Sequence, residues 1–366
     1  MSPCLILSGA ATGYVTVTSN RREVTQWLRA YFGSWWYAKE EKQQRGPLVQ
    51  ADVNPDDLDD LTQQACTRPV ATAMYGGVPM TYRHASNGDV LAAQVNRHLA
   101  YRYTPGGALR IVGADPFHVE LAAARLARER ARAQLYASGW SLLRASAVAT
   151  QDGKAVLALG PKGVGKSTTA VHLVHAGRGD LVSVGKVFVK PGPYGVSVLS
   201  WPSAAAIGFG LLDACGLYDT VAWKVKTGTN LFPTTDAYVI DALLHKRRTP
   251  VRDARGRELK PHFHPRQLGD LLVLPTKGGG IAGRLLYPTL EPAFQPTVAD
   301  GGRPVGYDDF VTTDDPHYPD VFGLLPQGTE GPEWMALRAL NAVPRNTLSL
   351  GHDADVNKDL LRKITA

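Results

Sequence analysis

The segment GPKGVGKST, residues 160–168, constrains the fold more than any other part of the chain. It matches the pattern G-x-x-x-x-G-K-[ST], in which a glycine-rich loop surrounds the phosphates of a nucleotide. Such a loop needs a buried strand before it and the start of a helix after it. The apolar run 155–159 precedes the motif, and the segment 167–176 follows it with a helical pattern that Gly177 closes. We therefore predict an α/β protein in which a P-loop joins a strand to a helix.

The residue types explain how this loop would hold a nucleoside triphosphate. Gly160, Gly163 and Gly165 let the backbone curl so that its amides point at phosphate oxygens, and the following helix adds the positive end of its dipole. Lys166 reaches the β- and γ-phosphates, and the hydroxyl of Ser167 is placed to bind Mg²⁺. The motif predicts ATP or GTP with Mg²⁺ without choosing the base. The predicted nucleotide-binding residues are Gly160, Pro161, Lys162, Gly163, Val164, Gly165, Lys166, Ser167 and Thr168.

Length and composition indicate a globular protein of two parts. The chain has 366 residues, more than one hydrophobic core usually holds, and 44% of them are hydrophobic while 20% are charged. We expect a smaller N-terminal α+β subdomain over 1–113, in which 70–113 is predicted to form short strands with glycine turns, and a P-loop domain over 114–366. The net charge of +7 suits phosphorylated or acidic ligands, but it does not by itself indicate nucleic acid.

Cysteine usage and hydropathy bear on the compartment. Cys4, Cys66 and Cys215 lie far apart and form no C-x-x-C pair, so we expect neither a disulfide framework nor a zinc ribbon. The N-terminus lacks the basic region of a signal peptide, and no apolar stretch reaches the roughly 18 residues of a membrane helix. We predict a cytoplasmic protein that contacts neither membrane nor nucleic acid; the sequence is also compatible with a homo-oligomer.

An arginine-rich helix is expected over 116–138. Asp115 is a suitable N-cap, Pro116 suits the first turn, and Gly139 suits the end of the helix. Four arginines recur along it, and we interpret them as a solvated face. They are Arg125, Arg128, Arg130 and Arg132.

The segment RASAVATQDGKAVLALGPKGVGKSTTAVHLVHAG resembles the core of HPr kinase/phosphorylase-like proteins, which share a P-loop sheet with phosphoenolpyruvate carboxykinase. The resemblance covers about residues 116–200 and is faint beyond. It implies a mixed-sheet P-loop domain of that type. It also implies transfer of phosphate from the nucleotide to a hydroxyl of a small molecule or a peptide, with Lys166, Arg144 and Asp180 as candidate catalytic residues.

The chain departs from the family at two places. Arg144 stands where the family has a histidine; a guanidinium cannot act as a base, but it can clamp a phosphate or carboxylate. Val184 and Gly185 stand where the family has two aspartates, which serve as general base and metal-side partner, and neither can do this. Asp180 lies nearby, although at the wrong end of its strand. Other candidate replacements are Asp213, Asp236, which we expect to cap a helix, and Asp241.

Three functions remain open from the sequence. The first is a kinase that phosphorylates a hydroxyl, and the second is a nucleotide-binding sensor or scaffold partner that has lost catalysis. The third is an enzyme whose substrate accepts the proton itself. Three further segments carry weaker signals. His262 and His264 have metal-like spacing without a third ligand. The basic stretch 246–260 suits an acidic partner or a mobile loop, and the tail 300–332 is expected to be a long ordered loop.

Overall fold

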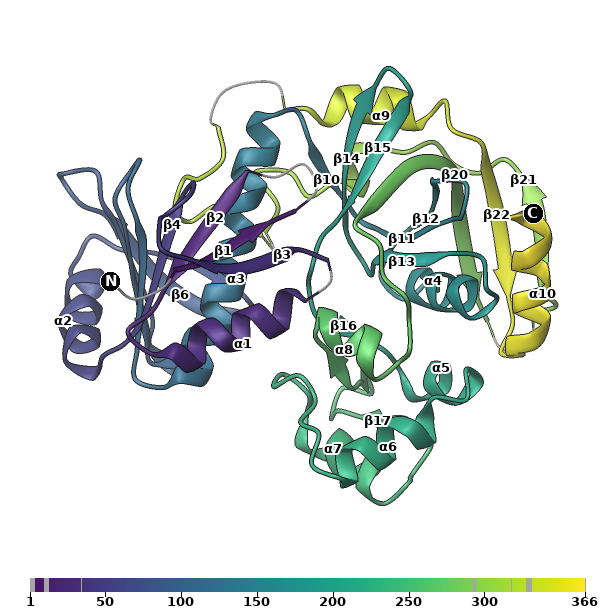
Figure 1. Ribbon diagram of the computed structural model, residues 1–366, viewed down its shortest axis with the longest axis horizontal. Helices are drawn as coiled ribbons and strands as arrows, with labels where there is room; N and C mark the ends of the chain where they lie inside the picture. Colours follow the sequence, from purple (N-terminus) through teal and green to yellow (C-terminus); the bar gives the residue numbers. More distant parts are fainter. Residues whose placement is uncertain are drawn as a thin grey trace. The chain divides into compact units, whose positions relative to one another are not determined.

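The computed structural model describes residues 4–9, 13–33, 35–291, 294–316, 318–326 and 331–365. It divides into two compact units. The first comprises Met1–Ser141 and Val311–Glu333, and the second comprises Leu142–Phe310 and Trp334–Ala366. Each unit is built on a sheet that contains parallel and antiparallel pairs (Figure 1). The expected mixed α/β class is therefore confirmed.

The described residues of the first unit form a nine-stranded sheet. Its strands are β1 (Cys4–Ser8), β2 (Tyr14–Thr18), β3 (Tyr37–Glu41), β4 (Leu48–Val53), β5 (Ala71–Tyr75), β6 (Val78–His84), β7 (Val90–Gln94), β8 (Leu99–Tyr103) and β9 (Leu109–Gly113), in the order β3-β1-β2-β4-β9-β8-β7-β6-β5. Helices α1 (Arg22–Phe32) and α3 (Pro116–Ala137) pack on each other, while α2 (Pro55–Cys66) lies against β6 to β9. A short helix η1 (Val95–Arg97) joins β7 to β8.

The sheet of the second unit carries the glycine-rich loop. Its strands are β10 (Ser141–Leu143), β11 (Ala145–Ala149), β12 (Lys154–Leu159), β13 (Asp180–Ser183), β14 (Val187–Gly192), β15 (Gly195–Ser200), β20 (Gly279–Leu290), β21 (Thr297–Asp300) and β22 (Arg345–Leu350). The order is β10-β14-β15-β20-β12-β11-β13, with β22 beside β20 and β21 beside β22. Strand β12 pairs parallel with β20 and antiparallel with β11, so the sheet is mixed.

Helices cover this sheet and complete its core. Helix α4 (Lys166–His175) contacts β11, β12 and β13 and packs against α10 (Ala354–Ile364). Alternate strand residues such as Ala147 and Leu157 instead join a buried cluster with Ala336 and Leu340 of α9 (Glu333–Leu340). Since neighbouring strand residues point to opposite faces, the sheet buries both faces and its strands read as continuous apolar runs.

The segment 201–278 forms a mainly helical excursion between β15 and β20. It contains α5 (Phe209–Ala214), α6 (Tyr218–Lys226), α7 (Ala237–Leu244), α8 (Pro265–Asp270) and the short strands β16 (Ala205–Ala206), β17 (Val251–Arg252), β18 (Glu258–Leu259) and β19 (His262–Phe263). Strand β16 pairs with β19, and β17 pairs with β18. The carboxylate of Asp236 accepts a hydrogen bond of 2.8 Å from the amide of Tyr238, which confirms its predicted role as the cap of α7.

The arginine-rich helix has the predicted limits but belongs to the first unit. It runs from Pro116 to Ala137, and Asp115 caps it by accepting the amide of Phe117 at 3.3 Å. Because α3 packs on α1 and on β2, β4 and β9, the boundary expected at residue 113 falls at 141 instead.

The tail 300–332 is shared between the two units. Its first part, which includes η2 (Tyr307–Asp309), belongs to the second unit, and the part from Val311 onward belongs to the first. Of that tail, 317 and 327–330 lie outside the described residues.

The interpretation of the arginine stripe as a solvated face is wrong. Tyrosines and carbonyls of the first unit surround it instead. Arg128 donates to the hydroxyl of Tyr31 at 2.7 Å, and Arg132, only 2% exposed, donates to the carbonyl of Val311 at 2.8 Å. The guanidinium of Arg125 lies 3.8 Å from the ring centre of Tyr75. Long side chains have become part of the interior because each finds aromatic faces or polar partners there.

Candidate functional site

The glycine-rich loop connects β12 directly to α4, as the motif predicts (Figure 1). Gly160, Gly163 and Gly165 have φ angles of 127°, 99° and 104°, which side-chain-bearing residues rarely adopt. Space is also limiting at Gly165, where an added Cβ would lie 3.2 Å from the Cβ of Leu290. Glycine is thus favoured here by backbone conformation, at the point where β12 leads into the start of a helix.

The ammonium of Lys166 folds back onto this loop. It donates hydrogen bonds to the carbonyls of Gly160 at 2.6 Å and Pro161 at 2.7 Å. Burial lowers the pKa of Lys166, and the positive charges of Arg144 and Lys186 lower it further, whereas Asp309 raises it. Arg144, Lys186 and Asp309 are thus charged side chains whose electrostatic influence reaches Lys166.

Strand register places the backbones of Arg144 and Lys186 at the end of the sheet that carries the loop. Ala145 pairs with Leu159, so Arg144 lies at the end of the sheet where the glycine-rich loop begins. Ala147 pairs with Ser183 on β13, so the residues that follow Ser183 approach the same end. The amide of Gly185 donates to the hydroxyl of Ser146 at 3.0 Å, which fixes this second loop beside the first.

Asp309 is the functional candidate that sequence reasoning missed. It lies in η2 and is 5% exposed. Its carbonyl accepts the amide of Arg144 at 2.7 Å, and its carboxylate accepts two hydrogen bonds from Arg303, at 2.6 and 2.5 Å, and one from the amide of Gly306 at 2.9 Å. Burial alone would raise the pKa of Asp309, but the hydrogen bonds from Arg303 and Gly306, with the charges of Arg303 and Lys166, hold it below its ordinary value.

No local signal marks Asp309 in the sequence. It follows Tyr307-Asp308 in a tail rich in Gly, Pro and Asp, where acidic residues are usually solvated turn formers. Its approach to Lys166 depends on the bridge between Leu143 and Phe310, a contact between segments far apart in the chain. A single sequence carries no pattern for such a pairing.

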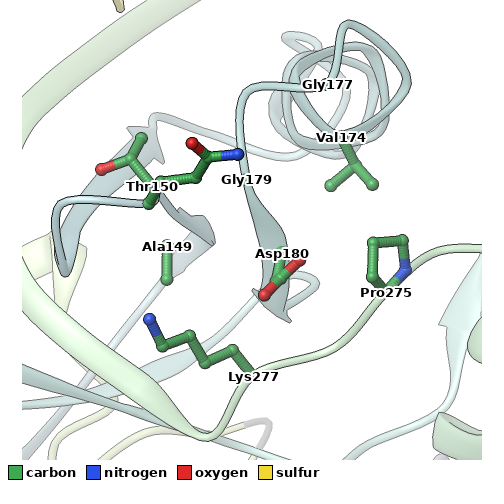
Figure 2. Close-up of a pocket in the computed structure, with 9 residues that line it drawn as sticks. Ala149, Thr150, Val174, Gly177, Gly179, Asp180, Pro275 and Lys277 are labelled. Carbon is green, nitrogen blue, oxygen red and sulfur yellow. The ribbon is translucent and has the colours of Figure 1, made fainter.

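Asp180 lies at the opposite end of the sheet from the glycine-rich loop. It pairs with Ala149, which in turn pairs with Ala155 near the beginning of β12. Four residues of strand, about 13 Å, therefore separate it from the end that carries Arg144. Asp180 and Lys277 line a cavity of about 190 Å³ at this far end, and Figure 2 shows both side chains. That cavity is separate from the loop.

The remaining acidic candidates serve other contacts. Asp213 pairs with Arg248, and Asp241 pairs with Arg247, in exposed ion pairs of the helical excursion. Gly185, aligned with one family aspartate, has a φ angle of 87°, so the loop conformation itself favours glycine there. Val184, aligned with the other, is buried.

The two histidines with metal-like spacing have structural partners. His262 Nδ1 lies 2.5 Å from the hydroxyl of Thr234, and His264 Nδ1 accepts the amide of Gln267 at 3.4 Å as the N-cap of α8. Burial lowers the pKa of His264 to about 4. Throughout the described parts of the chain, no three His, Cys, Asp or Glu side chains gather in a way that suits a metal ion.

The other residues of the motif differ in their exposure. Pro161, Lys162 and Gly163 are exposed, whereas Ser167 and Thr168 are half-buried in the first turn of α4.

The chain matches no protein-family model and no curated protein sequence. Within the ranges that the structure describes, every helix is too short or too polar to cross a membrane.

Proposed function

We propose that this protein is a nucleotide-dependent phosphotransferase that moves the γ-phosphate of ATP or GTP to a hydroxyl of a small molecule or peptide. The observation that carries this proposal is the glycine-rich loop with Lys166 at the start of α4, surrounded by further charged groups. The mixed sheet and the resemblance around the loop favour a P-loop domain of the HPr-kinase and carboxykinase type. A reducing, cytoplasmic setting is part of the same proposal.

The loop would bind the triphosphate by replacing contacts that Lys166 makes internally. Its ammonium now donates to two loop carbonyls, at 2.6 and 2.7 Å, and phosphate oxygens are stronger acceptors for a charged donor. Backbone amides and the dipole of α4 would add to the attraction. The same groups would stabilise charge on the transferred phosphoryl group, which supplies most of the catalysis in such reactions.

The residues present fit a magnesium ion held largely by the nucleotide. Ser167 offers a hydroxyl oxygen in the first turn of α4, immediately after Lys166. Mg²⁺ prefers oxygen ligands and usually keeps several waters, so one protein hydroxyl with phosphate oxygens is a suitable donor set. The ion would neutralise phosphate charge during transfer.

We assign to Asp309 the carboxylate role that Asp180 was expected to fill. Among the described residues, Asp309 is the carboxylate that acts on the charge of Lys166. Its lowered pKa keeps it ionised at neutral pH, so it would offer an incoming hydroxyl an anionic acceptor in addition to the two hydrogen bonds from Arg303. A loose transition state places little demand on a strong base, which suits a carboxylate already paired with Arg303.

A second function is favoured by Val184 and Gly185. Because neither side chain can carry out proton transfer, the protein would bind nucleotide and act as a sensor or scaffold without turnover. Both functions require the nucleotide, whereas only the first yields a phosphorylated product.

Calorimetry with Mg²⁺ and ATP or GTP tests the shared requirement. Lys166→Ala should weaken binding at least tenfold, whereas Lys154→Ala, a control at an exposed lysine on the other end of β12, should not. No binding by the wild type would reject both functions.

Incubation with γ-labelled nucleotide and a cell extract, followed by mass spectrometry, then distinguishes the two functions. A labelled product that depends on Lys166 supports the kinase, and bound nucleotide without any product supports the sensor.

A further inference from the structure

The cavity of about 190 Å³ at the far end of the second unit's sheet combines two opposite charges with apolar surface. Asp180, at the start of β13, contributes a carboxylate, and Lys277, just before β20, contributes an ammonium (Figure 2). Ala149 of β11 and Val174 of α4 add apolar groups to the lining. The cavity therefore offers an acceptor and a donor of hydrogen bonds, each with a full charge.

Neither charged side chain has a partner among the residues that the structure describes: no ion pair or side-chain hydrogen bond there includes Asp180 or Lys277. Both are half-buried. The turn that follows β11 shows the usual alternative, because Asp152 and Lys154 pair with each other at 3.4 Å. A charge that is partly removed from water gains more from an opposite charge than it would in bulk solvent. A ligand that carries both charges would satisfy both side chains.

The backbone holds the walls of the cavity in place. The amide of Leu181 donates to the carbonyl of Pro275 at 2.7 Å, and the carbonyl of Leu181 accepts the amide of Lys277 at 3.0 Å. Gly179 approaches β11 so closely that an added Cβ would clash with the carbonyl oxygen of Ala149. Because these segments are already fixed, a ligand would bind without ordering them, which favours affinity.

The size of the cavity restricts the ligand. Pockets for drug-sized compounds have volumes of roughly 300–1,000 Å³, so this cavity suits a smaller molecule. An ammonium group would donate to the carboxylate of Asp180, and a carboxylate would accept from the ammonium of Lys277. Carbon atoms between or beside these groups would contact the apolar lining. A free α-amino acid has both charged groups within this size.

We infer that this cavity binds a small zwitterion of the free α-amino acid class, with its ammonium group on Asp180 and its carboxylate on Lys277. The site is distinct from the glycine-rich loop, because four residues of strand, about 13 Å, separate Asp180 from that end of the sheet. The inference goes beyond the proposed phosphotransferase function and does not depend on it.

The test titrates the common L-amino acids singly into the full chain by calorimetry, without nucleotide. The amino acid that binds most tightly is then compared with its amide, which lacks the carboxylate, and with its N-acetyl form, which lacks the ammonium group. We expect each derivative to bind the wild type at least tenfold more weakly than the parent. Asp180→Asn should remove the preference for the parent over the N-acetyl form, and Lys277→Met should remove the preference over the amide.

Asp219→Asn and Lys226→Met are the controls for the loss of one exposed charge of each sign, and both lie in α6. They should change the affinity less than threefold. No binding of any amino acid at millimolar concentration, equal binding of parent and derivatives, or unchanged affinity in either cavity variant would each reject the inference. Failure to bind a triphosphate would reject the proposed function alone. Asp180→Ala and Lys277→Gln, checked by thermal denaturation, repeat the measurement should either first variant fail to fold.

Discussion

Charged residues around Lys166 act in opposite directions on its ammonium. Arg144 and Lys186 favour its neutral form, whereas Asp309 favours the charged form that phosphate binding requires. The carboxylate also holds Arg303 through two hydrogen bonds. A single buried side chain thus links the loop to the segment that follows β21, so its removal should affect chemistry more than nucleotide affinity.

Asp309→Asn should lower the rate of phosphoryl transfer about 10²-fold or more, the usual range for loss of a positioned carboxylate. Nucleotide affinity should fall much less, because the loop amides and Lys166 remain. Rates of product formation and calorimetric affinities would be compared with those of Asp300→Asn, the same chemical change at an exposed aspartate that accepts a hydrogen bond from Asn346. A rate equal to that of the wild type would show that Asp309 has no part in the reaction.

His172 should make folding stability depend on pH. It is 2% exposed, lies 3.9 Å from the sulfur of Cys215, and burial lowers its pKa from 6.5 to about 4. The unfolded chain therefore binds the proton more readily between these two values. The free energy of unfolding should fall as pH drops from about 6.5 to about 4, by at most about 3 kcal/mol from this residue. Urea unfolding at several pH values measures it.

His172→Gln provides the matched comparison, since its side chain does not titrate. Part of the slope should persist because His264 has a similarly lowered pKa and contributes in the same direction. Equal slopes in the variant and the wild type would show that folding does not change the pKa of His172.

At the scale of elements, the loop between β12 and α4 depends on glycine for two separable reasons. Gly163 and Gly165 both have positive φ angles, but an added Cβ meets nothing within 4 Å at Gly163, whereas at Gly165 it would lie 3.2 Å from Leu290. Gly163→Ala should therefore destabilise by about 1 kcal/mol through backbone strain alone. Gly165→Ala should destabilise more, as measured by chemical denaturation; equal losses would show that contact with β20 is unimportant.

A second prediction at the scale of elements concerns Arg132, a buried side chain of α3. Arg132 donates to the carbonyls of Val311, at 2.8 Å, and Thr312, at 3.1 Å. Arg132→Ala should lower the free energy of unfolding by about 3 kcal/mol or more, because it leaves two carbonyls without a donor and opens a cavity. Arg29→Ala, at an exposed arginine of α1, should change it by less than about 0.5 kcal/mol. Denaturant titration compares the two, and similar effects would contradict the buried role of Arg132.

Local sequence patterns predicted the limits of helices and strands better than they predicted which side chains are buried and what those side chains contact. The limits of α3 follow from Asp115, Pro116 and Gly139, and the strand, loop and helix around Lys166 follow from the motif. The burial of the arginine stripe does not follow, because its tyrosine partners come from elements that are distant in sequence. Asp309 was missed for the same reason: its place beside Arg144 is set by a long-range bridge.

For the whole molecule, ligand binding and unfolding should be coupled. A nucleotide that binds only the folded state stabilises it by about 2.7 kcal/mol at a hundredfold excess over its dissociation constant. Thermal scans with Mg²⁺ and ATP or GTP should therefore raise the melting temperature, more for the preferred base, and Lys166→Ala should remove the response. Unchanged melting with every triphosphate at millimolar concentration would count against nucleotide binding.

The division of the chain has a consequence for its synthesis. The first unit needs Val311–Glu333, yet the ribosome makes these residues only after nearly all of the second unit's sheet has emerged. Until then the guanidinium of Arg132 lacks the carbonyls that it binds in the finished protein. The first unit is therefore completed only after 142–310 has been made, the part of the second unit that contains the glycine-rich loop. Gene fragments that stop at residue 113 or 141 would therefore encode an unfinished unit.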